Sequence, residues 1–186
     1  MHRLAFSDCI GPAMRFELID GVESFEAGKK LVAWKGLTLG EEYLADHFPA
    51  YPVMPGVLML EALSQSAAWL IRVSTGFVYP VAVLREVKGV KYGTFVEPGN
   101  RLRLVVEVSS PSPDGESCWA FKGTGFVDKQ VAVAGRLKLA AYKLADRMVE
   151  GDKYDRDLVE YLRRKWTWLT SGRLTSRVDP ALREPV

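Results

Sequence analysis

One apolar segment stands out in the hydrophobic pattern of this 186-residue chain. From Val57 to Val73 nearly every side chain is apolar or small, which predicts a helix that is buried on all sides. Its few polar side chains are Glu61, Ser64, Gln65, Ser66 and Arg72. Pro55 is expected at the first helical position, where proline costs no hydrogen bond, and Thr75-Gly76 is expected to end the helix.

The segments on both sides of this helix predict strands. Upstream, residues 15–37 predict two strands, the first including Phe16 and Leu18, joined by a turn at 26–29. A short helical turn is expected at 41–46. Downstream, strands are expected at 81–84, 87–92, 101–108, 119–127 and 131–139, with turns at 97–100 and 111–115. One helix among successive antiparallel strands is an α+β arrangement.

A second amphipathic pattern lies near the C-terminus and predicts a helix over residues 155–170. The residues that fall at helical spacing and form this stripe are Leu158, Tyr161, Leu162, Lys165, Trp166 and Leu169. We expect it to pack on its own domain or on a second copy of the chain. The last dozen residues are expected to be disordered. The chain is therefore divided into a domain at 1–142 and an extension at 143–186.

Composition narrows the class of protein. The apolar content of 48% and the length suit one globular domain. The net charge is 25 − 23 = +2, which is too small to indicate a nucleic-acid partner. No apolar run predicts a membrane span, and the N-terminus is a poor signal peptide. Cys9 and Cys118 are far apart, so we expect free thiols in a reducing cytoplasm, without a disulfide framework or a metal site.

The stretch before the long helix combines a rigid backbone with two ionisable side chains. Pro49, Pro52 and Pro55 each fix a φ angle, so the loop that begins at His47 is expected to be rigid. Glu61 lies inside the apolar helix, where a carboxylate needs a partner or a function. We interpret His47 and Glu61 as a base and an acid.

Structural explanations exist for each of these residues taken alone. A single histidine in a loop is usually structural or exposed. Glu61 alternatively caps a backbone group or pairs with Arg72 or Arg85. Asp46 is a weak candidate for orienting the imidazole, because adjacent side chains rarely point the same way. The combination of a rigid loop, a proline before a buried helix and a carboxylate inside that helix favours a functional pair.

This region resembles the 3-hydroxyacyl-(acyl carrier protein) dehydratases of fatty-acid synthesis, of the FabZ type. The matching residues are His47-Phe48-Pro49, Pro52-Val53-Met54-Pro55-Gly56-Val57-Leu58, Glu61-Ala62 and Gln65. The likeness extends through residues 16–22, 27–30 and 87–108, and covers roughly residues 12 to 142. It implies a hot-dog fold, in which a curved antiparallel sheet wraps around a central helix. The isomerising FabA type carries Asp where this chain has Glu61, which favours the plain dehydratase.

The resemblance implies a homodimer whose active site takes His47 from one subunit and Glu61 from the other. His47 exchanges protons near neutral pH and is expected to take the C2 proton. Burial favours the protonated form of Glu61, which is expected to protonate the leaving hydroxide. The N–H of Gly56, assisted by that of Val57, is expected to stabilise the thioester oxygen at the helix N-terminus. Gln65 either holds the Glu61 carboxyl or has a purely structural role.

The expected partner is an acyl carrier protein that bears a phosphopantetheine-linked acyl chain, and no cofactor is needed for proton transfer. Basic residues that could contact this acidic partner are Lys88, Lys91, Arg101 and Arg103. The C-terminal helix is alternatively a carrier-docking surface or a lid over the substrate. Alternative functions are dehydration or hydrolysis of polyketide, polyene or coenzyme A thioesters, and carrier binding without catalysis. The alternative to a homodimer is a trimer of dimers.

Overall fold

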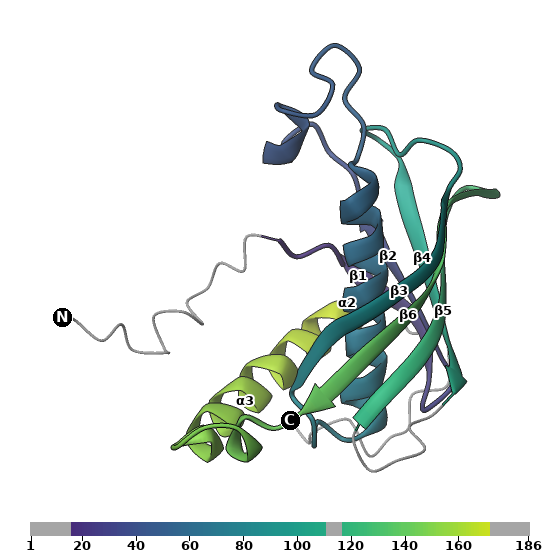
Figure 1. Ribbon diagram of the computed structural model, residues 1–186. Coiled ribbons are helices and arrows are strands. Elements are labelled where there is room, and N and C mark those ends of the chain that lie inside the picture. The colour runs from purple at the N-terminus through teal and green to yellow at the C-terminus, as the bar shows by residue number, and fades with distance from the viewer. Residues whose placement is uncertain (1–15, 111–116, 172–186) are drawn as a thin grey trace.

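The computed structural model describes residues 16–110 and 117–171. Within these ranges six antiparallel strands form one sheet, in the order β1-β2-β4-β5-β6-β3. Their bounds are β1 (Gly21–Glu26), β2 (Lys30–Gly36), β3 (Val81–Tyr92), β4 (Arg101–Ser110), β5 (Ser117–Val127) and β6 (Gln130–Tyr142). The sheet curves around helix α2 (Gly56–Ser74), and helix α3 (Gly151–Thr170) lies on the other side of α2 (Figure 1). The predicted α+β class, with a curved sheet around a central helix, is confirmed.

Several predicted boundaries were wrong. Residues 16–20 precede β1 and form no strand, because the backbone groups of Phe16 and Leu18 bond to a side chain of α2. The two strands predicted between 81 and 92 are the single strand β3, whose register shifts twice along its length. Pro55 is the N-cap of α2 and lies one residue before the helix. The extension helix begins at Gly151, four residues earlier than predicted. The turn predicted at 111–115 and the C-terminal disorder lie outside the described residues.

The core lies between α2 and the concave face of the sheet. Leu63 and Leu70 of α2 are fully buried, as are Leu104 of β4 and Leu139 of β6. Gly123 of β5 allows the close approach of helix and sheet. A Cβ atom there would lie 2.8 Å from Leu137 Cδ1 and 3.2 Å from Leu63 Cδ1. Although α2 is largely apolar, no helix in the described ranges is long and apolar enough to cross a membrane.

The end of α2 is set by backbone conformation. The helix ends at Ser74, and Gly76 follows with φ of +60°. The N–H of Phe77 then donates to the carbonyl of Arg72 at 2.7 Å, which closes the last turn. Phe77 is itself buried. The predicted end of the helix at Thr75-Gly76 is therefore confirmed.

The predicted stripe of the extension helix packs on its own chain. Leu162, Trp166 and Leu169 are each 5% exposed, so the inner face of α3 joins the core. The Trp166 ring lies 5.7 Å from the Phe25 ring of β1 and 5.8 Å from the Trp69 ring of α2, measured between centroids. A short 3-10 helix, η2 (Leu144–Asp146), connects β6 to this helix.

Candidate active site

The N-terminal end of α2 offers two backbone donors. The first helical hydrogen bonds run from the N–H groups of Leu58 and Met59 to the carbonyl of Pro55. The N–H groups of Gly56 and Val57 precede these bonds and are left without a helical acceptor. A Cβ atom on Gly56 would lie 2.9 Å from Cε1 of Tyr92, so only glycine fits beneath that ring without a shift. Contrary to the prediction of a helix buried on all sides, the Val57 side chain is 69% exposed.

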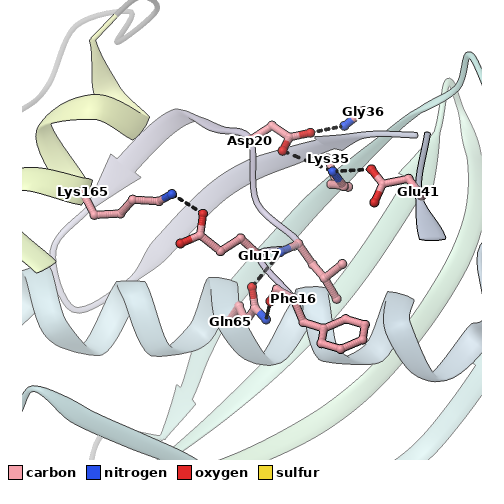
Figure 2. A network of polar contacts seen from close by, with 9 residues as sticks. Phe16, Glu17, Asp20, Lys35, Gly36, Glu41, Gln65 and Lys165 are labelled. Atoms are coloured by element: carbon pink, nitrogen blue, oxygen red, sulfur yellow. Dashed lines mark hydrogen bonds and ion pairs between the residues drawn. The ribbon is translucent and has the colours of Figure 1, made fainter. Parts of the chain in front are cut away.

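Glu61 lies just over one turn further along α2 and is half-buried. Gln65 Nε2 donates a hydrogen bond to Glu61 Oε1 at 3.0 Å. The other bonds of this amide reach the segment before β1. Nε2 also donates to the Phe16 carbonyl at 2.9 Å (Figure 2). Oε1 accepts from the Leu18 N–H, also at 2.9 Å. Gln65 therefore holds the Glu61 carboxyl against a fixed segment of backbone, and Glu61 forms no ion pair with Arg72 or Arg85.

The same segment is fastened on its outer side to the extension helix. Glu17 forms an ion pair with Lys165 (Figure 2). Glu17 also accepts a hydrogen bond from the Tyr161 hydroxyl at 3.1 Å. Burial, together with the charge and hydrogen bond of Glu17, raises the pKa of Tyr161. A chain of contacts thus runs from α3 through Glu17 and Gln65 to Glu61.

The loop formed by residues 45–55 projects beyond the N-terminal end of α2 (Figure 1). His47 belongs to this loop. It is half-buried, and its ring lies 4.5 Å from the Phe48 ring between centroids. Phe48 has φ of +54°, an uncommon value for a non-glycine residue. Asp46 is exposed and forms no hydrogen bond with His47, so the structure gives no support to Asp46 as an orienting group.

A buried ion-pair cluster anchors the start of this loop. Lys35 of β2 is 7% exposed and bonds Glu41 at 2.7 Å and Asp20 at 3.3 Å (Figure 2). Burial alone would lower the pKa of Lys35, but the hydrogen bond to Glu41 and the charges of both carboxylates outweigh it and raise this pKa. Glu41 directly precedes the 3-10 helix η1 (Glu42–Leu44), the predicted helical turn, so the cluster fixes the approach to His47.

One chain does not bring the two candidate residues together. Within residues 16–110 and 117–171, no hydrogen bond or ion pair joins His47 to Glu61. Glu61 lines a cavity of about 220 Å³ between α2 and α3, and His47 is not among the lining residues. A site containing both side chains therefore requires a second copy of the chain or a movement of the loop.

Some residues that position Glu61 and the loop before His47 were not predicted as site residues. The segment at 16–18 was expected to be a strand, and Lys35, Asp20 and Glu41 were not predicted to form a cluster. The spacing of residues along the sequence gives no signal for contacts of this kind. In the described parts of the chain, no group of three His, Cys, Asp or Glu residues is placed to hold a metal ion.

The sequence has clear relatives. A sequence model of the FabA-like domain family matches residues 11–136. The chain is 42% identical over 140 residues to the 3-hydroxyacyl-(acyl-carrier-protein) dehydratase FabZ of Anaeromyxobacter sp. (strain Fw109-5), covering 73% of this chain and 84% of the relative. It is 39% identical over 123 residues to the FabZ of Janthinobacterium sp. (strain Marseille), covering 64% and 77%.

Solved structures with the same fold are more distant in sequence. The dehydratase heterocomplex ApeI:P from Xenorhabdus doucetiae aligns with a TM-score of 0.55 at 15% identity, covering 69% of this chain and 85% of that one. A conserved protein from Pseudomonas aeruginosa aligns with a TM-score of 0.52 at 17% identity, covering 74% and 94%. These likenesses confirm the hot-dog fold. The sequence matches place the chain in the FabA-like family, as a member of its FabZ-type 3-hydroxyacyl-(acyl-carrier-protein) dehydratases.

Proposed function

We propose that this protein dehydrates 3-hydroxyacyl thioesters of acyl carrier protein to trans-2-enoyl thioesters in fatty-acid synthesis. The observation that carries the proposal is the order of groups along α2. The free amides of Gly56 and Val57 come first, followed by the Glu61 carboxyl that Gln65 holds at 3.0 Å. That order suits a substrate in which the thioester carbonyl and the hydroxyl-bearing carbon are separated by one carbon.

In this proposal His47 takes the proton from C2 of the substrate. The N–H of Gly56, assisted by that of Val57, stabilises the negative charge that develops on the thioester oxygen. Glu61 donates its proton to the hydroxyl at C3, so that water leaves as the C2–C3 double bond forms. The pair resets when the proton returns from His47 to Glu61. No electrons are exchanged, so the step needs no redox cofactor.

We infer that the working unit is a homodimer in which His47 of one subunit faces Glu61 of the other. Two observations support it. His47 does not line the cavity beside Glu61 in its own chain, and β3 lies at an edge of the sheet with Val83 and Tyr92 exposed. Pairing of two such edges would cover the exposed strand. We assign the catalytic domain to residues 1–142, and a trimer of these dimers is the alternative assembly.

An acidic acyl carrier protein is the proposed partner, and Lys91 is the most available of the predicted contacts. Arg101 and Arg103 both bond Glu23, at 3.1 and 2.7 Å, and Lys88 bonds Glu86 at 2.7 Å. These three cations would have to exchange an internal partner for the carrier. Lys91 is exposed and forms no ion pair within the described ranges.

The test follows the absorbance of the conjugated thioester when the purified full chain is mixed with crotonyl-(acyl carrier protein). Hydration removes that absorbance without releasing thiol. We expect Glu61→Gln and His47→Ala to lower the rate by about 10²- to 10⁴-fold. The matched control is Glu160→Gln, which changes an exposed carboxylate of α3.

Two results would contradict the proposal. Thiol release that colours a thiol reagent would identify a thioesterase. Binding of the acylated carrier without turnover at any chain length would identify a protein that only binds the carrier. Full activity in both active-site variants would show instead that the assigned roles are wrong.

A further inference from the structure

One wall of the cavity beside Glu61 is formed by α3, which lies outside the region that matches the FabA-like family. The family match ends at residue 136, whereas α3 begins at Gly151. The cavity of about 220 Å³ lies between this helix and α2. Its lining includes Glu61, Ala68 and Trp69 of α2 and Leu158, Leu162 and Leu169 of α3.

The wall formed by α3 is held in place by several contacts. Trp166 packs edge-on against Phe25 and beside Trp69, and Lys165 forms an ion pair with Glu17. At the start of the helix, the Asp155 carboxylate accepts hydrogen bonds from two N–H groups of η2, each at 2.9 Å. A helix fastened at both ends is a fixed boundary, so the cavity has a defined size.

The order of groups along α2 matches the order of groups in an acyl thioester. Along α2 the order is Gly56, the proposed carbonyl donor, then Glu61, the proposed acid at C3, and then the cavity. Arg72, which lies 11 residues beyond Glu61 on α2 (72 − 61), is also among the residues that line the cavity. Arg72 Nε donates to the Pro80 carbonyl at 2.9 Å, and its guanidinium lies 5.4 Å from the Trp69 ring centroid, so this part of the lining is also built from fixed groups.

We infer that α3 forms the outer wall of the acyl-chain site and limits the length of acyl chain that the enzyme accepts. The inference rests on the proposed function, because C3 of the substrate must lie at Glu61. A dry cavity of about 150 Å³ in another protein is large enough for benzene, so about 220 Å³ suits a short chain of roughly four to eight carbons. Longer chains would have to displace Leu162 and Leu169.

The experiment compares kcat/KM for the 3-hydroxybutyryl, 3-hydroxyoctanoyl and 3-hydroxydodecanoyl thioesters of acyl carrier protein. Leu162→Ala enlarges the cavity from α3, and we expect the dodecanoyl-to-butyryl ratio of kcat/KM to rise about tenfold. Ala68→Leu fills the cavity from α2, and we expect the octanoyl-to-butyryl ratio to fall about tenfold. Arg164→Ala, on the exposed face of α3, is the matched control and should leave both ratios unchanged.

The two variants act in opposite directions from different helices, so a fault in folding cannot mimic the expected pattern. Circular dichroism and thermal unfolding check that each variant is folded at the assay temperature. Unchanged ratios in both folded variants, with the wild type active, would overturn the role of α3 and leave the proposed dehydratase standing. If the wild-type protein turned over none of the three thioesters, the proposed function would fail, and this inference with it.

Discussion

Gln65 shows how one side chain determines the geometry of another. Its amide bonds Glu61, the Phe16 carbonyl and the Leu18 N–H, so three of its hydrogen-bonding positions are occupied within the chain. An amide held on both sides has little freedom to rotate. The Glu61 carboxyl is therefore placed by residues that are far from it in sequence as well as by its own helix.

At Gly56 we predict that added volume harms catalysis. Gly56→Ala places a Cβ atom 2.9 Å from Cε1 of Tyr92 and beside the amides proposed to bind the thioester oxygen. We expect kcat/KM for crotonyl-(acyl carrier protein) to fall by about 10²-fold. The double variant Gly56→Ala/Tyr92→Ala removes the internal clash and should recover thermal stability but not activity. Recovery of activity would show that Gly56 serves only the packing of Tyr92.

At the scale of elements, the Lys35 cluster joins β2 to the approach to His47. The pKa of Lys35 is raised above its ordinary value of 10.5, so its contribution to stability is complete below pH 10.5 and is lost as the pH rises through the folded value. We expect Lys35→Met to lower the free energy of unfolding by about 3 kcal/mol at pH 7, since it removes the cation that Asp20 and Glu41 share.

The measurement is denaturant unfolding of wild type and variant across the alkaline range. The difference between them should shrink above pH 10.5, where Lys35 loses its proton in the unfolded chain but keeps it in the folded protein. Lys29→Met is the control, because the Lys29–Glu26 pair is largely exposed and its loss should cost little at any pH. A difference that stays constant up to pH 12 would contradict the assigned ion pairs.

The extension helix offers a matched pair of tryptophans. Trp166 is 5% exposed between Phe25 and Trp69, whereas Trp168 is 59% exposed. We expect Trp166→Ala to lower the free energy of unfolding by about 3 to 5 kcal/mol, because it opens a cavity in the core. Trp168→Ala should change it by less than about 0.5 kcal/mol. Equal effects in thermal or denaturant unfolding would mean that α3 does not pack as described.

At the scale of the whole molecule, the separation of His47 from Glu61 predicts complementation between subunits. His47→Ala and Glu61→Gln proteins are each expected to be inactive. After unfolding and refolding together, half of the dimers should be mixed, and each mixed dimer would hold one intact site. Activity should therefore return to about a quarter of the wild-type value. Failure to recover activity, with mixed dimers shown by differential tagging, would place both residues of a site in one chain.

Much of the architecture was predictable from local pattern. Apolar runs and alternation are short-range signals, and they predicted the α+β class, α2 and most strands to within a few residues. Proline and glycine marked the two ends of α2 for the same reason. The first strand was predicted too early in the chain. The alternating apolar residues Phe16 and Leu18 look like a strand in the sequence, but their backbone groups bond to the Gln65 side chain and not to a neighbouring strand.

By itself the sequence determined the identity and order of the chemical groups, which are His47, the amides after Pro55, Glu61 and Gln65. The spacing of the last three along α2 follows from helix geometry. The tertiary structure alone decided what surrounds them. The bonds from Gln65 to Phe16 and Leu18, and the ion pair between Glu17 and Lys165, join residues 47 to 148 positions apart. Such pairs form because the chain folds back on itself. The local sequence pattern does not predict that α3 packs beside Glu61 of α2.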